Sequence, residues 1–173
     1  MPRKKKTDIT IEKPKPEISK YKVWRDVQEK KDVWDFPPSK YCAGTEETHL
    51  ITGDYTLENM ENIFVIERKA TTGELAGNVC TKQFENELKR GDKLKHFFVI
   101  CTFSMKDVLN FPYNSGIPRS IWPRLRITSH LLLKRIIELQ MEHNVKFLFC
   151  DNIDTAKEVA RSIFKRMIEK YHE

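Results

Sequence analysis

Two acids and a lysine, Asp54, Glu67 and Lys69, are the side chains whose types and spacing could do chemistry in this sequence. Glu67 and Lys69 follow four consecutive apolar residues, 63–66, which predict a strand covered on both faces. Because side chains alternate along a strand, Glu67 and Lys69 should point to one face and Arg68 to the other. An acid and an ammonium group are therefore predicted at one spot, at the end of a buried strand.

Asp54 lies in the preceding predicted strand, residues 53–57, which a short polar turn joins to the strand that carries Glu67. Two strands joined so closely predict a β-hairpin, whose antiparallel pairing can bring Asp54 opposite Glu67. Two carboxylates supply the hard oxygen ligands that Mg²⁺ or Mn²⁺ prefers. Lys69 could orient an attacking water or stabilise the negative charge that develops on phosphorus. The arrangement predicts metal-dependent hydrolysis of a phosphodiester bond.

A purely structural interpretation competes with this chemistry. Glu67 could form an ordinary salt bridge with Lys69 or with Arg68 at a strand end, and the E-R-K run alone favours that interpretation. Asp54, on the same predicted hairpin, favours the metal site, because buried charge is destabilising unless it is paired or bound to metal. For Arg68 the sequence leaves two partners open, a substrate phosphate or a structural acid.

The elements around these residues predict one α/β domain, residues 21–173, behind a basic arm, residues 1–20. The arm combines a basic run at residues 3–6 with prolines and few large apolar side chains, so it should not fold alone. It could contact phosphates, act as a nuclear-import signal, or do neither.

Strands and helices are predicted to alternate along the domain. A strand begins at residues 21–24, a turn-rich stretch follows through residue 38, and the hairpin comes next. Thr71 and Glu74 match a capping box, so one helix should start there, carry a stripe of apolar residues and end at Gly91 in the left-handed conformation. The stripe comprises Leu75, Val79, Phe84 and Leu88. Residues 97–101 predict another buried strand. Such alternation favours an α/β sandwich.

The second half of the domain is predicted to begin with a long excursion, residues 104–127, that contains three prolines and no regular element. A helix over Ser129–Glu142, a strand over residues 145–150 and a last helix capped by Asp154 should follow. The excursion interleaves arginines with a tryptophan, a combination that can hold phosphates and stack on an unpaired base. The candidate DNA contacts are Arg119, Trp122, Arg124 and Arg126. Alternatively, Trp122 packs into the core and the arginines are only solvated.

Composition favours a nucleic-acid partner inside the cell. The formal net charge is +6 and 32% of the residues are charged, so the surface should attract a polyanion, although solubility alone is the alternative explanation. Four scattered cysteines without a C-x-x-C pair argue against a zinc site and indicate reduced thiols. No apolar run approaches the roughly 20 residues of a membrane span, and no signal peptide is visible. We therefore expect neither a membrane nor a small-molecule cofactor.

The spacing of these residues also resembles a known family. Gly53-Asp54 followed by Glu67-Arg68-Lys69 is similar to the G-D…E-R-K signature of XPF-type (xeroderma pigmentosum group F) nuclease domains of the PD-(D/E)XK superfamily. The likeness covers about residues 21–103, and residues 34–36 and 44–45 are similar to small XPF-like nucleases of phages and prophages. The resemblance implies a restriction-endonuclease-like mixed central sheet flanked by helices. It further implies Mg²⁺- or Mn²⁺-dependent DNA cleavage in repair or recombination, with pairing of two copies. From the composition we expect a cytoplasmic location, or a nuclear one if the basic run at residues 3–6 is an import signal.

The resemblance extends to an upstream D-x-R-E element, which corresponds to residues 26–29. It implies that Asp26, as a third metal ligand, or Glu29 completes the acidic cluster, and Glu74 stands one place beyond the acid that usually trails the signature. Two family arginines are replaced, by Gln28 and by Gln83, and each change exchanges a fixed charge for a neutral amide. These glutamines motivate two alternatives: a DNA-binding module with weakened catalysis, and an assembly partner that uses only the nuclease fold.

Overall fold

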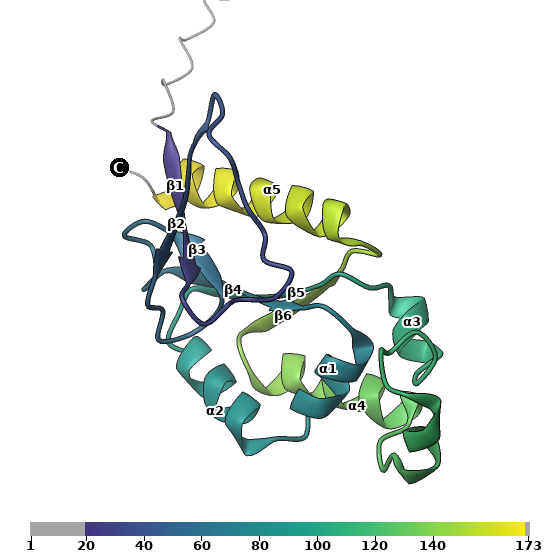
Figure 1. The fold of residues 1–173 in the computed structure, drawn as a ribbon. Helices are drawn as coiled ribbons and strands as arrows, with labels where there is room; N and C mark the ends of the chain where they lie inside the picture. Colours follow the sequence, from purple (N-terminus) through teal and green to yellow (C-terminus); the bar gives the residue numbers. More distant parts are fainter. Residues whose placement is uncertain (1–19, 172–173) are drawn as a thin grey trace, which may run out of the picture.

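The computed structural model describes residues 20–171, whose six strands form a single mixed sheet in the order β2-β1-β3-β4-β5-β6 (Figure 1). The β1–β2, β4–β5 and β5–β6 pairs are parallel, whereas β1–β3 and β3–β4 are antiparallel. The strands are β1 Tyr21–Asp26, β2 Cys42–Thr48, β3 Tyr55–Leu57, β4 Phe64–Lys69, β5 His96–Cys101 and β6 Val145–Phe149. This mixed sheet with helices on both faces confirms the predicted fold class.

Helices cover the two faces of the sheet unequally. Helix α5 (Ile153–Tyr171) covers one face alone, and α1 (Thr72–Asn78), α2 (Lys82–Gly91) and α4 (Ser129–Glu142) cover the other (Figure 1). Side chains of β4 alternate between the two cores: Val65 packs with the α1–α2–α4 group, and Phe64 and Ile66 pack with α5. All of β4 is buried, which confirms the prediction of a strand covered on both faces.

Strand β2 was not predicted from the sequence. Its residues, Cys-Ala-Gly-Thr-Glu-Glu-Thr, lack the apolar alternation that marks a half-buried strand. Within residues 20–171 the strand lies at the sheet edge and pairs with β1 alone, so most of its side chains need no apolar character. The parallel pairing instead comes from backbone hydrogen bonds, which leave no trace in the residue types.

The single helix predicted after Thr71 is in fact two helices, α1 and α2. The predicted apolar stripe is buried as expected, but Thr81 begins a new helix by accepting a hydrogen bond from the Phe84 amide at 3.2 Å. Thr71 caps α1 as predicted, whereas Glu74 accepts from the Ala70 amide and not from Thr71. The left-handed stop at Gly91 was also wrong. Gly91 is the last residue of α2, and a Cβ there would overlap the Phe97 ring. Glycine is needed here because any side chain would clash with that ring.

The excursion at residues 104–127 contains regular structure that was not predicted. Ser104 and Asp107 form a capping box that starts helix α3 (Met105–Leu109), and a 3-10 helix, η1, spans Arg119–Arg124. At the last helix, the cap is the Asn152 side chain, which accepts from the Thr155 amide at 2.9 Å, and not Asp154.

Three further points complete the description. All four cysteines are free thiols, and only Cys80 is exposed. Within residues 20–171, no helix is long and apolar enough to cross a bilayer. The predicted basic arm falls almost wholly outside the described residues.

Candidate active site

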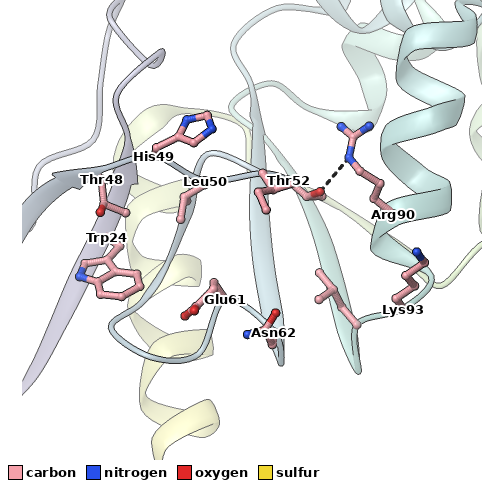
Figure 2. Close-up of a pocket in the computed structure, with 11 residues that line it drawn as sticks. Trp24, Thr48, His49, Leu50, Thr52, Glu61, Asn62, Arg90 and Lys93 are labelled. Atoms are coloured by element: carbon pink, nitrogen blue, oxygen red, sulfur yellow. Dashed lines mark hydrogen bonds between the residues drawn. The ribbon is translucent and has the colours of Figure 1, made fainter.

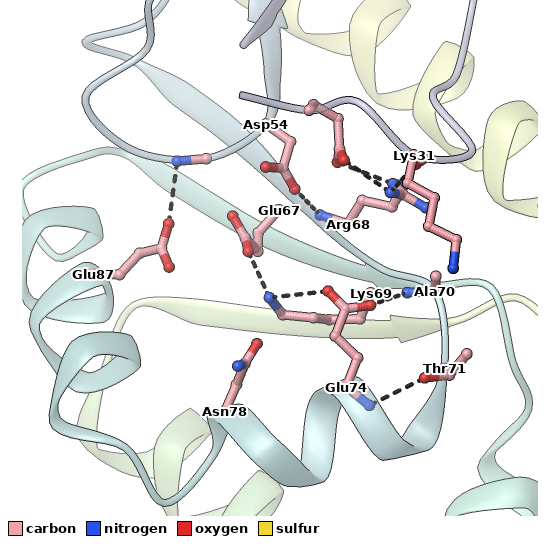
Figure 3. Close-up of polar contacts among 12 residues, drawn as sticks. Lys31, Asp54, Glu67, Arg68, Lys69, Ala70, Thr71, Glu74, Asn78 and Glu87 are labelled. Carbon is pink, nitrogen blue, oxygen red and sulfur yellow. Dashed lines mark hydrogen bonds and ion pairs between the residues drawn. The ribbon is translucent and has the colours of Figure 1, made fainter. Parts of the chain in front are cut away.

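The β3–β4 hairpin brings Asp54 opposite Glu67, as predicted. Tyr55 pairs with Ile66, and the Asp54 amide donates to the Ile66 carbonyl at 2.8 Å. The Arg68 amide then donates to Asp54 Oδ2 at 2.7 Å, which fixes the carboxylate beside β4 (Figure 3). Gly53 precedes Asp54 with φ +75°, and a Cβ there would lie 2.7 Å from Val65 Cβ. The turn that aims Asp54 at β4 therefore requires glycine.

Glu67 and Lys69 share one face of β4 and touch. The Lys69 Nζ atom lies 2.6 Å from Glu67 Oε1, and the two side chains are only 5% and 9% exposed (Figure 3). Lys69 also lies 3.8 Å from Glu74 Oε1 and 5.2 Å from the Phe84 ring centroid. The ammonium is thus held behind Glu67 by protein groups on three sides.

Arg68 occupies the opposite face and is paired with an acid of the protein. Its Nε and Nη2 atoms donate to the two Glu29 carboxylate oxygens at 3.0 and 2.9 Å, and Nη2 also donates to the Lys31 carbonyl at 2.7 Å (Figure 3). A bidentate, charge-assisted pair of this kind fixes geometry as well as charge. Of the two partners that the sequence left open, the structure gives Arg68 the structural acid.

Burial changes how the three ionisable groups titrate. Burial, with a smaller contribution from nearby Glu29 and Glu87, raises the pKa of Asp54 to about 7. Burial and the neighbouring Asp54 carboxylate raise the pKa of Glu67. For Lys69, burial lowers the pKa but the adjacent Glu67 carboxylate outweighs it, so the net pKa is raised. The lysine is a permanent cation at neutral pH and compensates one of the two acids, so the repulsion between the acids is only partly offset.

A cavity of about 480 Å³ opens in front of the two acids. Asp54 and Glu67 line it together with Asp26, Gln28 and Glu29, with the loop at residues 49–53, and with Gln83, Glu87 and Arg90 of α2. Asp26 lies at its edge, where Oδ1 accepts from the Leu50 amide at 3.1 Å. Gln83 faces the cavity, as the resemblance implied, although it does so from α2 and not from the helix begun at Thr71.

Glu87 is a cavity residue that sequence reasoning missed. Its Oε1 atom accepts from the Gly53 amide at 3.4 Å (Figure 3). It lies four positions after Gln83, one turn along the same helix. That i, i+4 relation was the available signal, since it places both side chains on one face.

The four candidate DNA contacts of the excursion do not line this cavity. Trp122 is half-buried: its Nε1 atom donates to the Ile117 carbonyl at 2.9 Å, and its ring meets the Tyr113 ring edge-on at a centroid distance of 4.9 Å. Arg119 lies over the same ring, and Arg124 and Arg126 are exposed. The segment contacts α1, where the Gly73 amide donates to the Ser115 carbonyl at 3.2 Å.

The carboxylates fit a hard divalent cation. No three His, Cys, Asp or Glu side chains within residues 20–171 are already gathered around one point, but Mg²⁺ commonly takes only one or two carboxylates and completes its shell with water and substrate phosphate. Asp54 commits Oδ2 to the Arg68 amide, and Glu67 commits Oε1 to Lys69. Asp54 Oδ1 and Glu67 Oε2 have no hydrogen-bond partner within residues 20–171 and would be the oxygens available to a cation, beside the open cavity.

Comparison with known proteins finds the same fold in two solved structures. Two solved structures are similar: "XPF from Aeropyrum pernix, complex with DNA" (16% identity, TM-score 0.60, 89% of this chain and 68% of that chain) and "XPF from Aeropyrum pernix" (17% identity, TM-score 0.57, 83% and 65%). Both share the fold, and this chain spans about two thirds of their length. None of the curated proteins matches by sequence. The ERCC4 domain matches residues 1–163. The chain therefore belongs to the ERCC4 domain family, a family of DNA nucleases.

Proposed function

We propose that this protein is a divalent-metal-dependent DNA endonuclease that hydrolyses phosphodiester bonds at the Asp54–Glu67 pair. One observation carries the proposal: buried Glu67 and half-buried Asp54 face each other across a hairpin, with raised pKa values, and each has one oxygen that no group within residues 20–171 bonds, beside a cavity. Uncompensated buried charge of this kind is destabilising. A bound cation would remove that penalty. Membership in the nuclease family supports the same assignment.

Each residue of the hairpin has a distinct proposed role. Asp54 and Glu67 hold Mg²⁺ or Mn²⁺, which polarises the phosphoryl oxygen when bound. Lys69 keeps its proton because Glu67 raises its pKa, so it acts as a hydrogen-bond donor and a fixed positive charge and not as a general base. The ion pair at 2.6 Å also fixes the orientation of Glu67. Asp26, at the cavity edge, is a candidate third ligand through water.

Binding of the DNA backbone is assigned to positive groups around the cavity. Arg90 donates from Nε to Thr52 Oγ1 at 3.0 Å, and a guanidinium held in this way can offer its two terminal amino groups to a phosphate. The exposed arginines of the excursion, Arg119, Arg124 and Arg126, would contact DNA further from the cut, with Trp122 stacking on an unpaired base. Since Trp122 is half-buried and bonded within its own segment, Trp122→Ala tests this contact: weaker DNA binding at unchanged thermal stability supports it.

The test of the proposed function is a cleavage assay with a matched pair of variants. Wild-type protein should cut at least one of duplex, nicked, flapped and single-stranded DNA with Mg²⁺ or Mn²⁺, and a chelator should stop it. Glu67→Gln should not cut, whereas Glu142→Gln, on the exposed side of α4, should cut like wild type. Absence of cleavage on all four substrates with Mn²⁺ present would overturn the proposal. Preference among the four would show whether cleavage is selective for DNA structure.

A binding module without turnover is the second candidate, and one observation favours it. Gln28 and Gln83 both line the cavity at positions where the family resemblance has arginines, so two fixed charges near the phosphate are replaced by amides. This candidate predicts salt-sensitive DNA binding that a chelator leaves unchanged, with no cleavage under any metal.

A further inference from the structure

A second cavity, of about 400 Å³, lies directly beside the candidate active site. The two share a wall made of residues 49–52 and Arg90. Figure 2 shows the other side chains that surround it: Trp24, Thr48, Glu61, Asn62 and Lys93. Its volume falls within the range of about 300–1,000 Å³ for small-molecule sites. We propose that this cavity binds one unpaired nucleobase of the DNA strand that the active site cuts, an inference that rests on the proposed nuclease function.

Trp24 supplies the surface on which a base would stack. It lies on β1 next to Val23, whose side chain is buried in the α5 core, so the Trp24 ring points to the opposite face of the sheet. The ring is half-buried and lines the cavity. Base–aromatic stacking is favourable for all four bases, because each has a π-face. The cavity therefore suits an unpaired base without requiring one sequence.

The β3–β4 connection supplies groups that can bond the edge of a base. Asn62 lines the cavity with an amide that both donates and accepts. Beside it, Glu61 Oε2 is buried and has no hydrogen-bond partner among the described residues. A buried acceptor without a partner is destabilising, and its terminal torsion is soft. The amino groups of cytosine, adenine and guanine are donors of the kind that this oxygen lacks.

The wall between the two cavities carries positive charge where a DNA strand would cross it. Arg90 lines both cavities, and Lys93 follows it near the end of α2 (Figure 2). The Thr52 hydroxyl accepts from Arg90 Nε, so the guanidinium stands at the boundary. A phosphate between the cut site and the next nucleotide would meet Arg90 as the strand passes from one cavity to the other.

Ile51 explains why an unpaired base is the favoured occupant. It lines both cavities and is 80% exposed, so its side chain projects into the space that the two cavities share. Apolar side chains that project in this way can insert between base steps and unstack them. At the boundary between two cavities, Ile51 would separate the base in the second cavity from its stacked neighbour. Intact duplex, whose bases are all stacked and paired, would fill the site less well.

The experiment measures binding and not cleavage, so that it can be read separately from catalysis. In a Glu67→Gln background, affinities are measured for single-stranded and duplex oligonucleotides, and a single abasic site is moved along the single strand. Trp24→Ala should weaken single-strand binding about 5- to 150-fold, the range of one lost base–aromatic stack, and duplex binding less than about twofold. An abasic site at one position of the single strand should weaken binding to the protein that retains Trp24 by the same factor. It should have little further effect on the affinity of Trp24→Ala, because both changes remove the same contact.

Two further variants keep the test decisive if Trp24→Ala does not fold. Trp24→Phe should retain most of the affinity and the abasic effect. Ile51→Ala, at an exposed position, should reduce the preference for single strand over duplex, whereas Ile137→Ala, an exposed isoleucine on α4, should not. The inference is overturned if no abasic position affects binding, if Trp24→Ala weakens duplex and single strand equally, or if a free deoxynucleoside monophosphate binds as tightly as the oligonucleotide. If wild type cuts no DNA, the proposed function fails whatever these affinities are.

Discussion

Charged side chains lie on both faces of strand β4 near its end, but the balance of charge differs between the two faces. On one face, Arg68 forms a bidentate pair with Glu29 and a further bond to a backbone carbonyl, so its charge is matched by an acid. On the other, Lys69 balances Glu67, but Asp54 adds a second carboxylate beside Glu67. Adjacent residues of one strand thus form a closed structural pair and an open chemical site. The comparison indicates that a functional site is distinguished by a charge without a counter-charge, and not by the presence of charged residues alone.

The sharpest test of this comparison makes the same change on both faces. Glu67→Gln removes a metal ligand at almost constant volume, so cleavage should fall by about 10³-fold or more, whereas Glu29→Gln should lower cleavage by less than about tenfold per folded molecule. Single-turnover rates at saturating Mn²⁺ measure both. Equal losses in the two variants would mean that the faces share one function.

The free energy of unfolding should fall more in Glu29→Gln than in Glu67→Gln, the reverse of the order expected for cleavage. Glu29→Gln leaves the buried Arg68 guanidinium without its counter-charge, and breaking such a pair lowers the free energy of unfolding by about 3–5 kcal/mol. We expect a loss near the lower limit, because glutamine keeps an acceptor. Urea denaturation of the metal-free proteins gives the measurement. A Glu29→Gln protein as stable as wild type would show that the Arg68 pair is not structural.

Removal of the unmatched charge should stabilise the metal-free protein, with a defined pH dependence. The pKa of Asp54 is raised from 3.8 to about 7, so the folded state binds this proton more tightly than the unfolded chain. Unfolding free energy is therefore lost as pH rises from about 4 to about 7. Asp54→Asn has no carboxyl group at this position, so its unfolding free energy lacks this pH dependence. Its gain over wild type should be small at pH 4 and about 1–4 kcal/mol at pH 8.

Thermal unfolding at both pH values, with chelator, measures this gain, and Asp35→Asn at an exposed position serves as control. Adding Mn²⁺ at pH 8 should raise the midpoint of wild type and not that of Asp54→Asn, since only wild type retains both ligands. A destabilised Asp54→Asn protein at pH 8 would indicate that the Asp54 charge is already compensated within the fold.

The smallest expected effect restores a charge on the open face. Gln83 lines the active-site cavity, so Gln83→Arg should add a charge-assisted hydrogen bond to a substrate phosphate, about 1.5–3 kcal/mol before its desolvation cost. Cleavage should quicken, and the slope of log affinity against log salt should steepen by about 0.7–0.9. If Arg90 or Lys82 already supports the phosphate, the arginine would crowd the cavity. An unchanged slope with an equal or lower rate would establish that result.

The hairpin was predictable because its information is local. The apolar run before Glu67 and the short turn after residue 57 are enough to place Asp54 opposite Glu67. Glu87 was missed because it reaches the cavity through packing of α2 on the sheet, and its residue type does not show that. The break between α1 and α2 was missed because the apolar stripe continues across it. Strand β2 was missed because an edge strand paired to β1 needs no pattern of its own.

The position of β1 in the sheet has a consequence for how the chain assembles. The first strand lies between β2 and β3, so during synthesis it must wait for partners that leave the ribosome later. The β3–β4 hairpin closes a much shorter loop and can form first. Asp54 and Glu67 therefore meet early, whereas Glu29 reaches Arg68 only after β1 has inserted. The site for chemistry should be present in a folding intermediate in which the structural pair on the other face of the same strand has not yet formed.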